Sequence, residues 1–287
     1  MTIRKLFIYL AFSPCLLAVF FFSCEKEKNE QVVQTQPPSN DEPLPPVHHS
    51  VRDSFLVDSV AWYESAENYK LCKYEYDELN RLKRRVLKTG IIEYSGMRIE
   101  LYIDTFLYSN GRLEKIEKSV TNGGNTSSLG YFLFFYDNEG KIVKSKYVNN
   151  ETCYGYHNGR VDSIYWENTS DFYSLLDYDA NGNVIRERRR CLENTTGQYY
   201  FQTTNYNYDN RPRPNFGMGD NFVYEPLMGM GTVVGNYIRN GSTNNLLGNG
   251  YSYWSYEYNE HGLPKAMYTG RFPGNSTKWQ FFYKAVE

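Results

Sequence analysis

Residues 134–142 have the sequence FFYDNEGKI, and this stretch decides the fold because it contains every part of a β-hairpin. Phe134 and Tyr136 stand at alternate positions, so they share one face of an extended strand. Asp137 is placed to cap a turn with its side chain, and Gly140 supplies the positive φ angle that closes a tight turn. Ile142 then begins the next strand. The stretch predicts two antiparallel strands joined by a tight turn.

The same pattern recurs about seven times along the chain. Each unit begins with aromatic or aliphatic residues at alternate positions of a strand. In most units an Asp or Asn then caps the turn, a Gly or Asn closes it, and an aliphatic residue begins the next strand. Two units shorten the loop to Asn110-Gly111 and Asn158-Gly159, which predicts two-residue type I′ turns. The units begin at Tyr74, Phe106, Phe134, Tyr154, Leu176, Tyr206 and Tyr256.

Repeated hairpins predict an all-β domain over residues 51–287, built as an antiparallel meander of roughly 13 to 16 strands. A sheet of this size curls, so we expect a curved sheet, a half-barrel or a barrel-like domain. One irregular insert, at about residues 210–250, is rich in Gly and Met and interrupts the repeat. It is either a functional lid or a plug of the core, and we favour the plug because Met and Phe fill irregular gaps.

The distribution of charge argues against two classes of function. The net charge of -2 gives no electrostatic basis for binding nucleic acid. Residues 83–85 and 186–190 put basic side chains on both faces of their strands, whereas a membrane-spanning strand keeps one face apolar. We therefore expect a soluble domain.

The N-terminus has the features of an export signal. Arg4 and Lys5 precede an apolar run over residues 6–22, which ends at Ser23 and Cys24. The run is short for a membrane-spanning helix, so a retained anchor is the less favoured alternative. Residues 24–50 are polar and rich in proline, which predicts a disordered tether.

Residues 21–24, FFSC, resemble a bacterial lipobox, in which the signal is cut between Ser23 and Cys24. The resemblance implies a diacylglyceryl cysteine that carries further acyl chains such as palmitate. The expected partner of Cys24 is then membrane lipid, and two or three chains anchor a protein stably. We expect an exported protein held at the bacterial outer membrane, with a lean towards outward display because charged residues follow the lipid cysteine.

The hairpin units resemble the YD-repeat family, whose units carry a Tyr-Asp-x-x-Gly-x-aliphatic core. A closer resemblance is to Bacteroidetes-type lipoproteins of unknown function described as having a porin-like fold. It rests on Tyr208-Asp209-Asn210 followed by Pro212 and Pro214, on Asn244-Asn245, and on a last hairpin with Gly262-Leu263-Pro264. That family has no assigned activity to carry over.

Catalytic chemistry has little support in the sequence. His157 and His261 fall in predicted turns, and neither lies in a recognisable nucleophile setting. Asp and Glu residues are too numerous to single out a pair, and no metal or cofactor motif is present. Cys72, Cys153 and Cys191 match no metal spacing, so we expect them to be small buried residues, and whether two of them pair stays open. The sequence therefore predicts a protein that is not an enzyme and uses no metal or cofactor.

A binding module is the favoured function. Trp62, Trp166 and Trp254 are the candidate residues that stack on a glycan or peptide, and an exposed aromatic row on the concave face of the sheet would support this role. Two alternatives stay open: an assembly lipoprotein that docks on an outer-membrane protein, and an extracellular hydrolase. Ser59 and Ser163, each after an Asp, resemble short O-glycosylation acceptors of Bacteroidetes-type envelope proteins.

Overall fold

The computed structural model describes residues 52–63, 69–93, 96–167, 169–193, 196–218, 233–249, 252–270 and 277–286. All of them belong to the second of the two units into which the chain divides, Asn40–Glu287. The predicted signal peptide and tether, with Ser23 and Cys24, lie outside the described residues. The structure thus bears on the predicted β domain, and the lipidation of Cys24 stays a prediction.

The described residues confirm an all-β domain, with a 17-stranded antiparallel sheet and the helix α2. The number of strands is one above the upper end of the predicted range. The strands are β1 (Phe55–Tyr63), β2 (Tyr69–Tyr76), β3 (Leu82–Glu93), β4 (Gly96–Ser109), β5 (Arg112–Asn122), β6 (Asn125–Tyr136), β7 (Ile142–Tyr147), β8 (Asn150–His157), β9 (Arg160–Trp166), β10 (Thr169–Tyr178), β11 (Val184–Leu192), β12 (Tyr199–Asn205), β13 (Asn207–Pro212), β14 (Asn244–Gly248), β15 (Tyr253–Tyr258), β16 (Pro264–Gly270) and β17 (Thr277–Ala285), and α2 spans Val233–Gly241.

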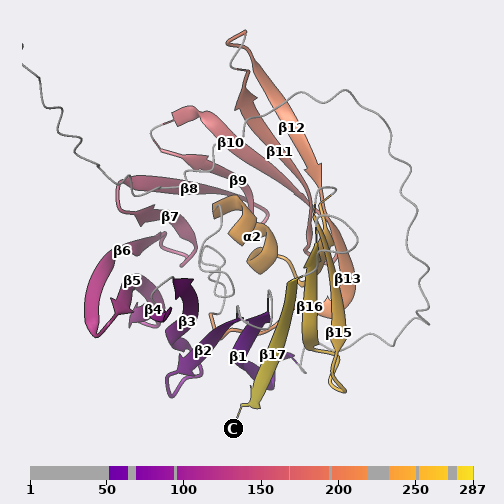
Figure 1. Ribbon diagram of the computed structural model, residues 1–287. Coiled ribbons are helices and arrows are strands. Elements are labelled where there is room, and N and C mark those ends of the chain that lie inside the picture. Colours follow the sequence, from indigo (N-terminus) through magenta and orange to yellow (C-terminus); the bar gives the residue numbers. More distant parts are fainter. Residues whose placement is uncertain are drawn as a thin grey trace, which may run out of the picture. The chain divides into compact units, whose positions relative to one another are not determined.

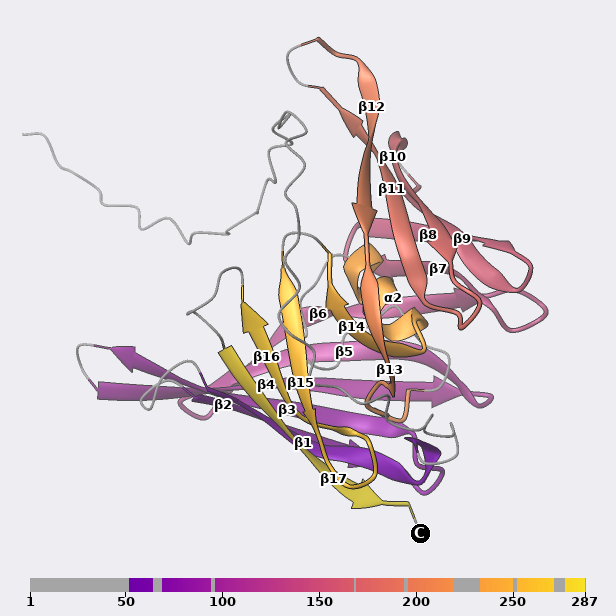
Figure 2. The same cartoon turned by 90° about the vertical axis from the view of Figure 1, so that its right-hand side faces the viewer.

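Sequential strands pair from β1 to β12, and β13 to β17 continue the meander back to the start. The pairing of β17 with β1 joins the last described strand to the first. Figure 1 shows the strands arranged in a ring, and Figure 2 shows the strand direction turning from β2–β5 towards β10–β12, as the twist of a sheet requires. The sheet forms a nearly closed barrel.

The ring closes through one stretch of backbone, residues 199–212. Its first part, β12, pairs with β11, and its second part, β13, pairs with β14. The N–H of Tyr206, between the two, still donates to the carbonyl of Ile185 at 2.9 Å. A single bent strand therefore links the long meander β1–β12 to the strands β14–β17.

The turns have the predicted chemistry. Asp137 Oδ1 accepts hydrogen bonds from the N–H groups of Glu139 and Lys141, both at 2.9 Å, and Gly140 has a φ of 90°. The corresponding turns at residues 77–81, 179–183 and 259–263 are capped in the same way. In the two short loops, the Asn and the Gly both have positive φ angles, as a type I′ turn requires. Six of the seven repeat units form the predicted hairpins. The unit that begins at Tyr206 does not, because β13 leads into the insert and pairs with β14 beyond it.

The insert is more regular than predicted, since it contains α2 and β14. Figures 1 and 2 show α2 inside the ring of strands, and Tyr237 and Ile238 belong to the core cluster together with Phe216. The Tyr237 hydroxyl lies 2.6 Å from that of Tyr178 on β10. The described part of the insert therefore acts as a plug of the core. Its helix escaped prediction because nine residues give too short a periodicity to recognise.

Candidate functional site

One line of opposed residues runs across seven neighbouring strands, from β6 to β12. Register pairs link the members from β6 to β10, and another pair links the two members on β11 and β12. Between them, the Arg190 guanidinium lies 5.7 Å from the ring centre of Tyr173. We call this line the outer row, and it consists of Phe135, Lys144, Cys153, Tyr165, Tyr173, Arg190 and Phe201.

The outer row lies on the outside of the barrel. Successive side chains of a strand point to opposite faces of the sheet. On each strand from β6 to β10, one residue next to the row member is buried, namely Phe134, Ser145, Tyr154, Ile164 and Ser174. Three row members are large exposed apolar side chains: Phe135 is 40% exposed, Tyr165 43% and Phe201 51%. The row thus presents aromatic rings to solvent on the convex face. It is a different surface from the concave row that, on the reasoning from sequence, would support a binding module and whose absence would leave a structural role.

Aromatic rings gather at the β9–β12 end of the row. Tyr173 and Phe201 make an edge-to-face contact with 5.9 Å between ring centres. The Arg190 guanidinium lies 4.0 Å from the centre of the Tyr199 ring, so a cation–π contact adds a further aromatic side chain. These contacts hold the rings in fixed relative positions.

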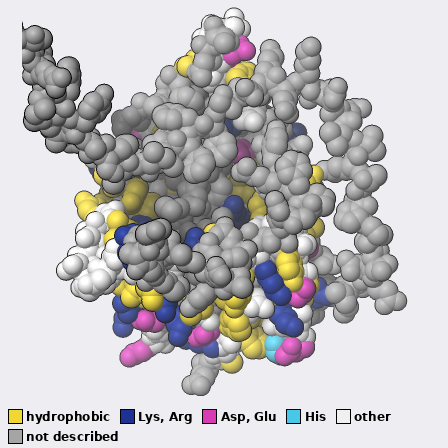
Figure 3. All heavy atoms as spheres, viewed as in Figure 1, with side chains coloured by type: hydrophobic (Ala, Val, Ile, Leu, Met, Phe, Trp, Pro, Cys, Tyr) yellow, Lys and Arg dark blue, Asp and Glu magenta, His cyan; other side chains and the backbone are white. Residues whose placement is uncertain are grey.

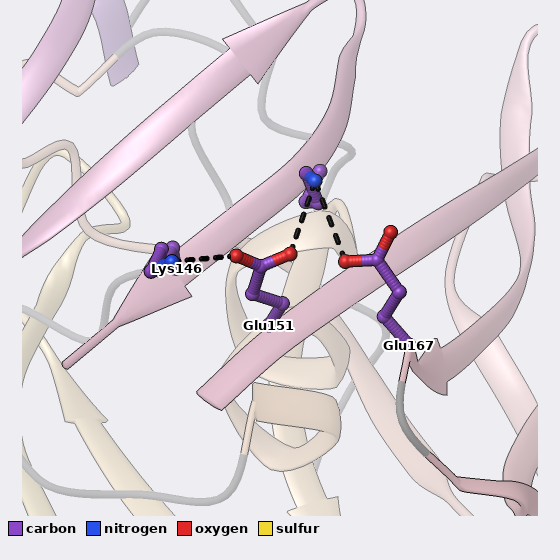
Figure 4. A network of polar contacts seen from close by, with 4 residues as sticks. Lys146, Glu151 and Glu167 are labelled. Carbon is purple, nitrogen blue, oxygen red and sulfur yellow. Dashed lines mark hydrogen bonds and ion pairs between the residues drawn. The ribbon is translucent and has the colours of Figure 1, made fainter. Parts of the chain in front are cut away.

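A network of opposite charges flanks the other part of the row. Lys144 Nζ donates to Glu151 Oε2 at 3.0 Å and to Glu167 Oε2 at 3.4 Å, and Lys146 Nζ donates to Glu151 Oε1 at 2.7 Å (Figure 4). Hydrogen bonding with Glu167, then with Lys146 and Lys144, lowers the pKa of Glu151 to about 2. The hydrogen bond to Glu151 raises the pKa of Lys144. Both groups are therefore charged at neutral pH, beside the exposed rings.

Rings beside fixed donors and acceptors have a defined chemical capacity. The face of an aromatic ring binds a flat apolar surface of a ligand. Ammonium and carboxylate groups beside the ring bind hydroxyl groups at the edge of that ligand. The row therefore suits a ligand with one apolar face and a polar rim.

The three predicted stacking tryptophans lie in different places. Trp62 packs against the core and stacks on Trp279, with 4.8 Å between ring centres. Trp254 also packs against the core, with the Arg239 guanidinium 5.9 Å from its ring. Trp166, at the end of β9, is 46% exposed. The structure does not bring them together, and their role in ligand binding stays a prediction.

The predicted modification sites both lie within strands. Ser59, on β1, is 8% exposed and donates to Asp58 Oδ2 at 3.2 Å. Ser163, on β9, donates to Asp162 Oδ1 at 3.0 Å. Their glycosylation stays a prediction.

The cysteines of the described domain are all free thiols. Cys72 and Cys191 are buried, as expected, whereas Cys153 is only half-buried and belongs to the outer row. The disulfide that the sequence left open does not form between these residues.

Two buried carboxylates inside the barrel are held by neighbouring groups. Asp104 lies 3.1 Å from Arg85 and 3.2 Å from Lys118. Glu187 accepts hydrogen bonds from Ser174 at 2.7 Å and from Tyr206 at 2.8 Å. Such pairing satisfies buried charge, which is a structural role.

The predicted turn positions of the histidines agree with the structure. His157 ends β8, and His261 lies in the turn between β15 and β16, with 4.6 Å between the centres of its ring and the Phe55 ring. Among the described residues, no group of three or more His, Cys, Asp or Glu is arranged to hold a metal. No helix of the described part of the chain is long and apolar enough to cross a membrane.

The outer row is not apparent from the sequence, because the aromatic residues of the repeat point inward. The members of the row lie beside those aromatics on the opposite face, and only the register of seven strands shows that they are opposed. One signal was present in the sequence. Tyr165, Tyr173 and Phe201 are aromatic residues outside the repeat pattern, at positions where a solvated strand face is usually polar.

Neither protein-family models nor curated protein sequences match the chain. Among solved structures, a porin-like protein from Bacteroides uniformis is similar over 79% of this chain and 98% of its own, with 9% identity and a TM-score of 0.51. A porin-like protein from Bacteroides vulgatus covers 80% of this chain and 99% of its own, with 15% identity and a TM-score of 0.36. The Tc holotoxin pore of Photorhabdus luminescens matches over 76% of this chain and 12% of its own, with 13% identity and a TM-score of 0.25.

The first of these similarities shows that the domain has a porin-like fold. It confirms the fold that the resemblance to the Bacteroidetes-type lipoproteins implied. The YD-repeat resemblance and the lipoprotein assignment stay expectations from the sequence.

Proposed function

We propose that this chain is a lipid-anchored protein of the bacterial outer membrane whose β domain binds glycans on the outer row without catalysis. The anchor is the acylated Cys24 of the sequence analysis, and the tether over residues 24–50 carries the domain away from the membrane. The outer row carries the proposal, because it combines three exposed aromatic side chains with a flanking network of charges.

A glycan fits this surface better than a peptide strand does. A pyranose ring has an apolar face of C–H groups and a rim of hydroxyl groups, which match a ring face beside ammonium and carboxylate groups. A peptide strand binds most often at an open sheet edge, and the nearly closed ring offers little free edge among the described strands.

The described surface also suits an uncharged ligand. Figure 3 shows hydrophobic, cationic and anionic side chains interspersed over the described part of one face of the molecule. The net charge of -2 agrees with this mixture. Ligand recognition then depends on ring stacking and hydrogen bonds, and the electrostatic potential of the surface attracts charged ligands only weakly.

The test is a glycan array probed with the purified full-length protein in detergent. We expect saturable binding to at least one glycan and loss of that signal in the variant Tyr165→Ala/Phe201→Ala. Phe282→Ala is the matched control, because Phe282 is exposed to 49% on β17, outside the row. The proposal would be contradicted if the wild-type protein bound no glycan on the array, or if the row variant and Phe282→Ala gave equal binding signals. Either result would favour the docking role on an outer-membrane protein.

A further inference from the structure

A cavity of about 440 Å³ lies at the end of the barrel where β2 turns into β3. It is distinct from the outer row, since none of its lining residues belongs to β6–β12. Its apolar lining includes Leu56, Phe216 and Met218, and amide side chains are contributed by Asn80, Asn215 and Asn240. A cavity of this size accommodates a ligand as large as a sugar.

The segment over residues 213–218 builds one wall of the cavity. It follows β13 and contacts β1 and β3. Val57 N–H on β1 donates to the Asn215 carbonyl, and Leu82 N–H on β3 donates to the Gly217 carbonyl, both at 2.9 Å. Asn215 Oδ1 accepts from Gly217 N–H at 2.9 Å and fixes the turn of the segment. Hydrogen bonds to two strands make this wall a fixed part of the fold.

Cationic groups dominate the charge of the lining. Arg52, Arg81 and Arg213 line the cavity, whereas Asp53 is the one acidic side chain among its described lining residues. Arg81 also forms an ion pair with Asp77 at 2.6 Å, which lies outside the lining. The planar guanidinium group binds a carboxylate through two parallel hydrogen bonds, so this lining favours an anionic ligand.

We propose that this cavity binds a sugar acid, with its carboxylate against the arginines and its hydroxyl groups against the asparagine amides. An amide side chain carries both donor and acceptor groups, which matches the dual capacity of a hydroxyl group. In Asn215 the oxygen already accepts from Gly217 N–H, so its NH₂ group is the one for the ligand. The apolar residues then contact the C–H face of the sugar ring. The site is separate from the glycan surface of the outer row and does not depend on it.

The test is calorimetric titration of the full-length protein in detergent with glucuronate and, as the uncharged partner, glucose. We expect saturable binding of glucuronate and binding of glucose that is at least about tenfold weaker, because a charge-assisted pair is lost. Added salt should weaken only the binding of glucuronate.

Variants locate the site. Arg213→Gln and Arg52→Gln should each weaken glucuronate binding at least about tenfold. Arg160→Gln, which changes an exposed arginine at the start of β9, should not change it. A melting curve of each variant shows whether it folds. If one of the two cavity variants fails to fold, the glucuronate affinity of the other tests the proposal. Equal affinity for glucuronate and glucose, no binding of either, or unchanged affinity in the folded cavity variants would overturn the proposal. The variant Tyr165→Ala/Phe201→Ala should bind glucuronate as the wild type does. The experiment therefore tests the cavity independently of glycan binding on the outer row.

Discussion

The hydroxyl of Tyr108 on β4 donates a hydrogen bond to the backbone carbonyl of Leu82, the first residue of β3, at 2.9 Å. The same bond recurs around the barrel at distances between 2.5 and 2.9 Å, from a tyrosine to a residue at or near the start of an earlier strand. In five of the seven pairs the tyrosine directly precedes a hairpin turn, and the exceptions are Tyr208 and Tyr283. The other pairs are Tyr76 with Val57, Tyr136 with Leu113, Tyr156 with Ile142, Tyr178 with Val161, Tyr208 with Val184, and Tyr283 with Pro264. This recurring contact explains why the repeat keeps tyrosine, whose hydroxyl phenylalanine lacks.

The substitution Tyr108→Phe should lower the free energy of unfolding by about 1 kcal/mol, because it removes one buried hydrogen bond and keeps the ring. The measurement is the midpoint of chemical denaturation. Tyr131→Phe is the control, since Tyr131 is 45% exposed on β6. Equal stability of the two variants would show that the recurring bond contributes nothing.

The substitution Gly217→Ala should destabilise the protein by roughly 2 kcal/mol or more. Gly217 has a φ of 64°, and a Cβ atom there would lie 2.5 Å from the Asn80 carbonyl oxygen. Gly197→Ala is the matched control, because its φ is 67° and a Cβ atom would meet nothing within 4 Å. It should lose only the conformational part, about 1 kcal/mol. Equal losses of stability for Gly217→Ala and Gly197→Ala in thermal melts would contradict the close approach of Gly217 to the turn between β2 and β3.

The substitution Asn183→Ala should loosen the plug and cost about 2 to 4 kcal/mol. Asn183 is 2% exposed, and its Oδ1 accepts from the N–H groups of Thr243 and Asn244, at 3.0 and 2.9 Å. Those residues connect α2 to β14. Hydrogen exchange should accelerate at residues 233–248 in this variant, while Asn181→Ala, an exposed neighbour, should leave it unchanged. Unchanged exchange in Asn183→Ala would show that the plug is held elsewhere.

The charge network beside the outer row should titrate at acid pH. Because the pKa of Glu151 is lowered to about 2, its interactions stabilise the folded state above its ordinary pKa, which is about 4.3. This contribution is lost as the pH falls from about 4.5 towards 2. The difference in melting temperature between the wild type and Glu151→Gln should therefore shrink across that window, and it should also shrink with salt. A carboxyl titration of Glu151 by NMR near its ordinary pKa would contradict the network.

Local chemistry was sufficient to predict the hairpins. Turn caps such as Asp137 and Asn259, and glycines such as Gly140, act within a few residues of chain, so their pattern is visible in the sequence. The preference for a plug over a lid was also correct for the described part of the insert, since Tyr237 is in the core.

Features that depend on distant contacts were not predictable. The closure of the ring through residues 199–212 depends on which strands meet β12 and β13, and no local pattern specifies that. Asn183 stands where other turns have Arg81 or Lys141, and its role appears only once the plug lies against it. The outer row likewise requires the register of seven strands. The exposed rings of the row lie on the outside of the barrel, whereas the sequence linked a binding role to an aromatic row on the concave face.

The most direct test of the central claim is the affinity of the full-length protein for an array-selected glycan, measured for the wild type, Tyr165→Ala/Phe201→Ala and Phe282→Ala. Loss of two stacking rings should weaken binding at least about tenfold in the row variant, and the control should match the wild type. Equal affinities in all three proteins would show that the outer row is not the glycan-binding surface.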